Sequence, residues 1–137
     1  MLTHATGTFE FKAWDEKTWE GKAARDVHGA KLTHASIRNA YHGDIEGEST
    51  SQILMVYDEN DHAIYTGLEQ ITGTLGGKAG SFVLHMDGRF DGGTAKGDWS
   101  VVPGSGTGDL KGLRGKGSFA AQLHVNHTPF TLNYDFE

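Results

Sequence analysis

Hydrophobic and polar residues alternate with a period of two along most of this chain. The carboxyl-terminal segment, residues 130–137, places four apolar or aromatic side chains on one face and Thr, Asn, Asp and Glu on the other. Successive side chains of a β-strand point to opposite faces, so this alternation predicts a strand with one buried face.

The same alternation recurs in seven further segments, which are separated by turns rich in glycine. Strands of this number and length suit a closed barrel, in which every strand shows one face to the interior and no sheet edge remains. We therefore predict an all-β fold, a single small antiparallel eight-stranded closed barrel that spans residues 1–137. The seven further strands are predicted at residues 5–14, 32–42, 46–57, 63–75, 81–90, 94–102 and 118–125.

Two stretches break the alternation. Residues 15–31 are polar and without a clear period, which predicts a long loop of the kind that often borders a binding site. Residues 58–62, "DENDH", predict a turn between two strands.

Composition and charge exclude several classes of function. The chain has 137 residues, which fits one domain, and it has no cysteine, which excludes disulfides, thiolate metal sites and thiol catalysis. Its net charge of -6 and the lack of a basic run argue against nucleic-acid binding. The amino-terminal residues show neither a secretory signal nor a membrane-spanning stretch, so we expect a cytoplasmic protein without a membrane partner.

Six glycines fall within residues 101–119, "VVPGSGTGDLKGLRGKGSF", and suggest a phosphate-binding loop. A P-loop requires G-x-x-x-x-G-K-[ST], but Gly117 follows Lys116 and Leu110 stands where the first glycine is needed. The dinucleotide pattern G-x-G-x-x-G also fails. Residues 73–82 and 108–119 instead share G-x-L-x-G and a closing G-S-F, which predicts connections between strands, the second with one helical turn and Asp109 near its amino end.

The same motifs carry a resemblance to a known family. "ATGTFEFKAWDEK", "LTHASIRNAYHGDIEGEST", "GLEQITGTLGGKAGSFVLH", "GDWSVVPGSGTGDLKGLRGKGSF" and the terminal "YDFE" resemble an uncharacterised bacterial domain-of-unknown-function family with an allene oxide cyclase-like barrel. The resemblance implies an eight-stranded barrel with an interior cavity, related in architecture to allene oxide cyclases, dirigent proteins and, more distantly, lipocalins. It supplies no established activity, and no residue of the cyclase active site can be matched.

One charged residue falls among apolar positions. Glu69 shares a strand face with Tyr65, Ile71 and Leu75, although the opposite face of this strand is also partly apolar and Glu69 could face water instead. Burial would raise the pKa of the carboxyl, which suits a general acid or base near neutral pH. We therefore take Glu69 as the candidate catalytic residue.

Companions of Glu69 are expected from inward positions on other strands. They combine aromatic and apolar side chains with a few hydroxyl and amide groups, the usual lining of a small-molecule site, although a small barrel can also be filled by its own side chains. The predicted ligand-binding residues are Asn39, Tyr41, Tyr57, Tyr65, Met86, Trp99 and Tyr134.

Three other kinds of site have weaker support in the sequence. Glu46 and Glu48 share a strand face, but Asp44 is close by and a solvated strand end explains them better than a catalytic pair. The eight histidines include no H-x-H, and His124 and His127 point to opposite faces of a strand, so no metal site is predicted. No G-x-S-x-G occurs, which disfavours a serine hydrolase.

Three functions therefore remain open. The first is a barrel that binds a small apolar or amphipathic molecule, oriented by Glu69 and nearby Tyr or Asn groups. The second is an isomerase or cyclase that uses Glu69 as a general acid or base or as an electrostatic stabiliser. The third is a filled, ligand-free barrel that serves assembly. No cofactor is predicted, and association into a homo-oligomer stays open because alternation does not show which outward patch forms an interface.

Overall fold

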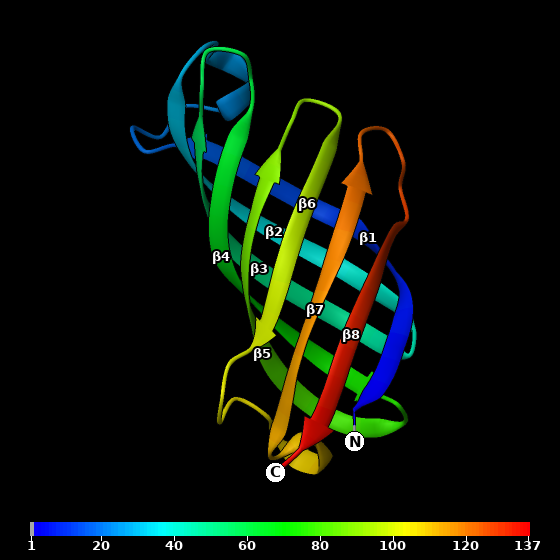
Figure 1. The fold of residues 1–137 in the computed structure, drawn as a ribbon. Helices are drawn as coiled ribbons and strands as arrows, with labels where there is room; N and C mark the ends of the chain where they lie inside the picture. Colours follow the sequence, from blue (N-terminus) through cyan, green and yellow to red (C-terminus); the bar gives the residue numbers. More distant parts are fainter. Residues whose placement is uncertain (1) are drawn as a thin grey trace.

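The computed structural model describes residues 2–137, which form a closed barrel of eight antiparallel strands (Figure 1). Each strand pairs with its neighbours in the sequence, and β8 pairs with β1 to close the barrel. The predicted fold class is confirmed. The strands are β1 (Thr3–Thr18), β2 (Lys31–Gly43), β3 (Ile45–Tyr57), β4 (Ala63–Leu75), β5 (Lys78–Phe90), β6 (Thr94–Val101), β7 (Leu113–Gln122) and β8 (Thr128–Phe136), with two short 3-10 helices, η1 (Ala24–Asp26) and η2 (Gly108–Leu110).

The alternation of the sequence maps directly onto the barrel wall. On β3 every second residue from Ile45 to Met55 turns inward and, Gly47 apart, is buried, while the residues between them are exposed. The same holds for the inward residues of β2 and for Phe130 to Tyr134 on β8. Because a strand exposes its two faces alternately, each strand contributes one row of side chains to the core.

The first strand is longer than predicted. Residues 15–18 are not a loop, because β1 continues to Thr18 and pairs with β2. The register shifts between Phe11 and Ala13, which marks a β-bulge. A bulge inserts one residue and so moves the following side chains to the opposite face, which hides the continuing strand from a period-two reading. Only the rest of the polar stretch connects β1 to β2, and it contains η1.

The seventh strand lies earlier than predicted. It begins at Leu113 and ends at Gln122, so Leu123 and Val125 belong to the turn that follows and are half-exposed. Gly115 and Gly117 occupy inward positions on its first half, where they carry no side chain and give no hydrophobic signal. A Cβ on Gly117 would overlap the main chain of β8, so the close approach of the two strands requires glycine there.

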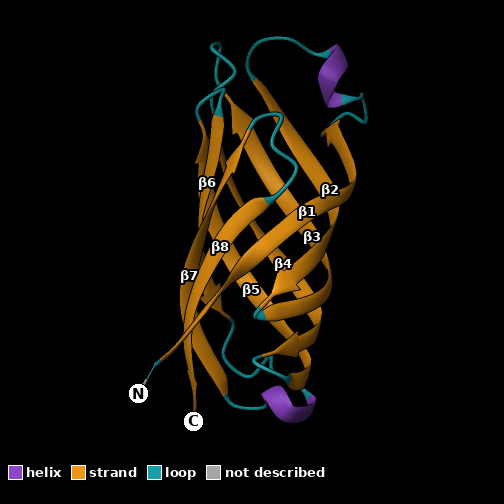
Figure 2. Ribbon diagram, turned by 90° about the vertical axis from the view of Figure 1, so that its right-hand side faces the viewer, coloured by secondary structure: helices purple, strands orange, loops and turns teal. Residues whose placement is uncertain are grey.

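The two ends of the barrel differ. Figure 2 shows η2 and its flanking loop across the end where both termini lie, while η1 and the turns after β3, β5 and β7 stand at the opposite end. Leu110 of η2 is fully buried and packs into the core, so the glycine-rich stretch is a strand connection with one helical turn, as predicted. Asp109 lies in that turn. Neither helical segment within residues 2–137 is long and apolar enough to span a membrane.

Candidate functional site

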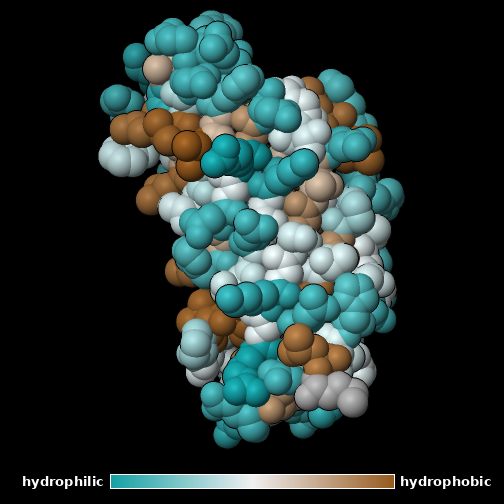
Figure 3. All heavy atoms as spheres, viewed as in Figure 1, coloured by the Kyte–Doolittle hydropathy of each residue, from teal (hydrophilic) through white to brown (hydrophobic). Residues whose placement is uncertain are grey.

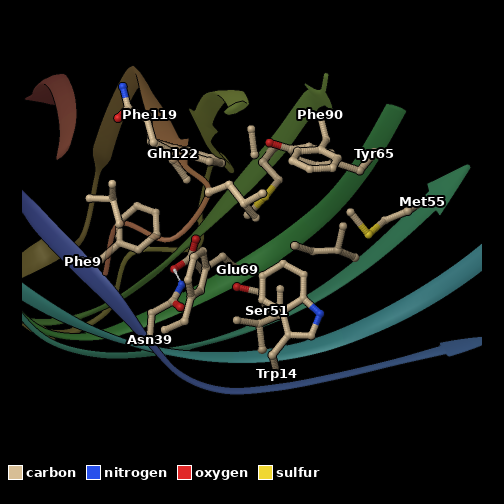
Figure 4. Close-up of a pocket in the computed structure, with 18 of the residues that line it drawn as sticks. Phe9, Trp14, Asn39, Ser51, Met55, Tyr65, Glu69, Phe90, Phe119 and Gln122 are labelled. Carbon is tan, nitrogen blue, oxygen red and sulfur yellow. Dashed lines mark hydrogen bonds between the residues drawn. The ribbon is translucent and has the colours of Figure 1, made fainter. Parts of the chain in front are cut away.

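The half of the barrel away from η2 encloses a cavity of about 360 Å³ (Figure 4). Strands β1 to β7 contribute to its lining, which is mostly aromatic and aliphatic. Its polar members are Asn39, Ser51, Glu69, Gln122 and His124. Trp14, Leu123 and Val125, which are about half exposed, line its outer end and connect it to solvent. An open cavity of this size counts against the filled, ligand-free barrel.

A layer of aromatic rings forms the floor of the cavity. The Trp99 ring lies between 5.6 and 6.3 Å, centroid to centroid, from the rings of four neighbours. Aromatic pairs at such separations contribute about 0.5–1.5 kcal/mol each beyond the area they bury. This layer separates the open half of the barrel from the packed half. The four neighbours are Phe9, Tyr41, Phe119 and Phe130.

Glu69 lies beside this floor and faces inward, with only 2% of its surface exposed. Three side chains from β2 and β3 donate hydrogen bonds to its Oε2 atom. Tyr41 and Ser49 do so at 2.6 Å each, and the Asn39 amide does so at 3.4 Å. Three donors on one oxygen stabilise the ionised form of a carboxyl group that is otherwise surrounded by apolar side chains.

Two polar atoms beside Glu69 Oε2 face the cavity without a protein partner. Within residues 2–137 no side chain donates to Glu69 Oε1, and the Ser51 hydroxyl makes no hydrogen bond, although both residues line the cavity. Ser51 stands directly opposite Glu69 across the β3–β4 pair. The Asn39 Oδ1 atom is also buried without a donor. The polar corner of the cavity therefore offers unfilled hydrogen-bonding capacity.

Burial raises the pKa of the Glu69 carboxyl above its ordinary value of 4.5, and the hydrogen bonds from Ser49, Tyr41 and Asn39 oppose that rise. Burial, together with the adjacent Glu69, raises the pKa of the Tyr41 hydroxyl well above its ordinary value. Tyr41 therefore keeps its proton and acts as a donor to Glu69. The raised pKa makes the Glu69 carboxyl a stronger candidate for proton exchange than an exposed glutamate would be.

The predicted binding residues divide into two groups. Asn39, Tyr57, Tyr65 and Met86 line the cavity. Tyr41 lies behind Glu69 and holds it in place, so its hydroxyl does not reach the cavity.

Trp99 and Tyr134 do not line the cavity, which corrects the sequence-based expectation. Trp99 is 2% exposed and belongs to the aromatic floor, and Tyr134 packs against Phe136 near the closed end. All inward positions look equivalent in a sequence. Their height along the barrel depends on strand tilt and register, which alternation does not reveal.

The Tyr65 hydroxyl is not available to a ligand. Its ring crosses the space that a side chain at Gly88 would occupy, and its hydroxyl donates to the main-chain oxygen of Lys96 at 2.9 Å. Gly97 makes room for the Phe119 ring in the same way. Glycines on the inward face thus let large rings lie flat along the wall, so that Tyr65 contributes apolar surface to the cavity.

Sequence reasoning missed a second carboxylate, Glu16. Its Oε2 accepts hydrogen bonds from Tyr57 at 2.6 Å and from Thr33 at 2.8 Å, and its Oε1 accepts one from Trp14 at 3.1 Å. Burial and the Glu16 carboxylate raise the pKa of the Tyr57 hydroxyl. All acceptor atoms of Glu16 are thus engaged, and it positions the Tyr57 and Trp14 rings at the rim of the cavity. The alternation of the sequence does not reveal Glu16, because the bulge in β1 shifts the face of the strand and turns this residue inward.

Ser49 and Ser51 were also missed, although their signal was present. They stand on the alternating face of β3 that carries Ile53, Met55 and Tyr57, and extending that face toward the amino end would have included both. The remaining acidic pair, Glu46 and Glu48, is exposed, as the solvated reading predicted. No group of three or more His, Asp or Glu side chains suited to a metal ion is found among residues 2–137.

The fold and the site together define a small closed β-barrel with an apolar interior cavity and one buried carboxyl group. Residues 5–134 match the family described as protein of unknown function DUF3224, and the chain belongs to that family. A solved structure of a protein of unknown function from the DUF3224 family of Shewanella oneidensis MR-1 is 28% identical, with a TM-score of 0.77. The similarity covers 100% of this chain and 99% of that one. No curated protein is significantly similar to this chain.

Proposed function

We propose that this protein binds a small, mostly apolar molecule inside the barrel, with one polar group of that molecule against Glu69. The observation that carries this proposal is the apolar cavity of about 360 Å³ whose inner end presents the unfilled Oε1 atom of Glu69. Ligand sites of proteins are typically cavities of about 300–1,000 Å³ lined by apolar side chains with a few polar groups.

The polar corner indicates which group the ligand carries. Glu69 Oε1 accepts a hydrogen bond when the carboxyl is ionised, and Asn39 Oδ1 is an acceptor in either state. The Ser51 hydroxyl can donate or accept. A ligand that bears a hydroxyl or an N–H group supplies the missing donor, and its apolar body fills the space between Ile53, Met86 and the rim. We therefore expect a small apolar alcohol, phenol or amine.

A neutral fluorescent probe, N-phenyl-1-naphthylamine, tests the proposal because it combines aromatic rings with one N–H group. We expect its fluorescence to rise on addition of the protein. Ala121 lines the cavity, and Ala121→Trp fills the space and should weaken probe binding at least tenfold. Ala40 lies on β2 outside the cavity lining, so Ala40→Trp serves as the matched control and should bind like the wild type. Equal binding by the three proteins would contradict a site in the barrel.

Native mass spectrometry of gently purified protein detects a retained ligand directly, by its mass. A stoichiometric extra mass that is lost in Ala121→Trp but kept in Ala40→Trp would place the retained molecule in the cavity.

The position of Glu69 also supports a second candidate function, an isomerase or cyclase of the kind weighed from the sequence. A carboxyl group with a raised pKa beside a mostly apolar cavity can transfer a proton or stabilise a developing positive charge. Glu69→Gln keeps the shape and removes the proton-transfer group. If the protein is an enzyme, turnover of a bound molecule identified by mass spectrometry should be lost while its affinity changes little. Unchanged turnover would exclude this role for Glu69.

A further inference from the structure

The outer wall of the barrel carries an apolar groove that the cavity does not explain. Five of its lining side chains are large, apolar and 43–62% exposed. Figure 3 shows hydrophobic atoms gathered at the left of the upper barrel, on the side where β4 lies in Figure 1. Exposed apolar side chains gathered in one place and rimmed by charged residues are typical of interaction surfaces. The five side chains are Trp19, Leu32, Leu54, Val56 and Ile64.

The strand register arranges the groove into two parallel rows that run across the strands. The first, here named the basic row, ends in Arg89 and Lys96, and the second, the acidic row, ends in Asp87 and Asp98. Each basic-row residue lies two positions along its strand from an acidic-row residue. The basic row is Leu32, Val56, Ile64, Arg89 and Lys96, and the acidic row is His34, Leu54, Thr66, Asp87 and Asp98.

The charged ends of the rows are unfavourable in a single copy of the chain. Asp87 stands directly opposite Asp98, and Arg89 stands directly opposite Lys96, on adjacent strands. Like charges in directly opposed positions destabilise a sheet. Within residues 2–137 none of the four forms an ion pair with another of the four, and Asp87 has only His85, at 3.8 Å. All four side chains are exposed.

We infer that this face is the interface of a symmetric homodimer, in which the basic row of each copy lies against the acidic row of the other. The two rows flank a middle row of inward-facing residues that includes Tyr65, Gly88 and Gly97. A twofold axis along that middle row, in the plane of contact, turns one copy over onto the other. Each outward residue then faces the residue two positions away on the same strand of its partner.

This symmetry makes the surface complementary to itself. Arg89 faces the partner subunit's Asp87, and Lys96 faces the partner subunit's Asp98, so both unfavourable like-charge pairs gain opposite charges. Val56 faces the partner subunit's Leu54, so these two exposed apolar residues cover one another. Leu32 and Ile64 face the partner subunit's His34 and the partner subunit's Thr66. An interface with a twofold axis is built from one patch used twice, as required here. Electrostatic complementarity of this kind also fixes the register of association.

Two charge-reversed variants test the arrangement. R89D/K96D makes both rows acidic, and D87K/D98K makes both rows basic. The wild type should sediment at twice its monomer mass of 14.8 kDa, with dissociation on dilution, and each variant alone should sediment as a monomer. An equimolar mixture of the two variants should recover the dimer, because an acidic face then meets a basic one.

A variant with the same change in net charge, made outside the groove, serves as the control. E48K/D109K changes the net charge as much as D87K/D98K does, at exposed sites outside the groove, and should remain a dimer. Far-ultraviolet circular dichroism verifies that each variant is folded. A wild type that is monomeric at all concentrations would overturn the inference. So would an oligomer that both variants keep, or variants that stay monomeric when mixed.

Discussion

Replacement of Tyr41 by Phe tests whether the buried Glu69 carboxyl is held in its ionised form. Tyr41 is 1% exposed, and its hydroxyl donates to Glu69 Oε2 at 2.6 Å. Phenylalanine keeps the ring that packs on Phe9 and Phe130 and removes only this donor. The change therefore isolates one hydrogen bond.

The expected loss depends on pH. A hydrogen bond to a charged group contributes about 1.5–3 kcal/mol to stability, and one between neutral groups contributes about 1 kcal/mol. At pH 8 Tyr41→Phe should reduce the free energy of unfolding by about 2–3 kcal/mol. At pH 4, below even the ordinary pKa of 4.5, Glu69 is protonated and the loss should be about 1 kcal/mol. Loss of the Tyr41 hydrogen bond, which lowers the Glu69 pKa in the wild type, should therefore raise the Glu69 pKa in the variant.

Urea unfolding at the two pH values measures these losses of stability. The unfolding is followed by tryptophan fluorescence at one protein concentration. Tyr134→Phe is the matched control, because Tyr134 is also buried but its hydroxyl has no hydrogen-bond partner within residues 2–137. The control should change stability by less than about 0.5 kcal/mol at both pH values. Equal losses for Tyr41→Phe at pH 4 and pH 8 would refute an ionised Glu69 held by Tyr41.

Two further predictions concern the same wall of the barrel. Burial raises the folded-state pKa of Glu69, so wild-type stability should fall as pH rises from 4.5 through that raised pKa, and Glu69→Gln should lack this fall. Urea unfolding at a series of pH values measures it, and parallel profiles of the two proteins would contradict the raised pKa. A Cβ on Gly88 would overlap the Tyr65 ring and the Lys96 main-chain oxygen, so Gly88→Ala should cost about 1–3 kcal/mol. A Cβ on Gly93 would make only an ordinary contact, 3.7 Å from Asp91 Oδ1, so Gly93→Ala should cost less than about 1 kcal/mol. Equal losses for the two variants would exclude the packing explanation.

The sequence indicated Glu69 because the signal is local. Its neighbours Tyr65 and Ile71 on the same face are buried, and alternation along one strand sufficed to place all three inward. Nothing along the strand shows that Tyr41 and Ser49, 28 and 20 residues away, both reach Oε2 and leave Oε1 free. That arrangement depends on how three strands are registered.

What the sequence by itself determined about this protein is the strand content, the closed barrel and the inward face of most strands. These follow from side-chain alternation with a period of two, which each strand expresses without reference to its neighbours. Only the tertiary structure decided that the bulge in β1 turns Glu16 inward and that Trp99 belongs to a floor below the cavity. It also decided that like charges on β5 and β6 stand opposite one another. Those features arise from strand register, tilt and closure, which are set by contacts between residues far apart in the chain.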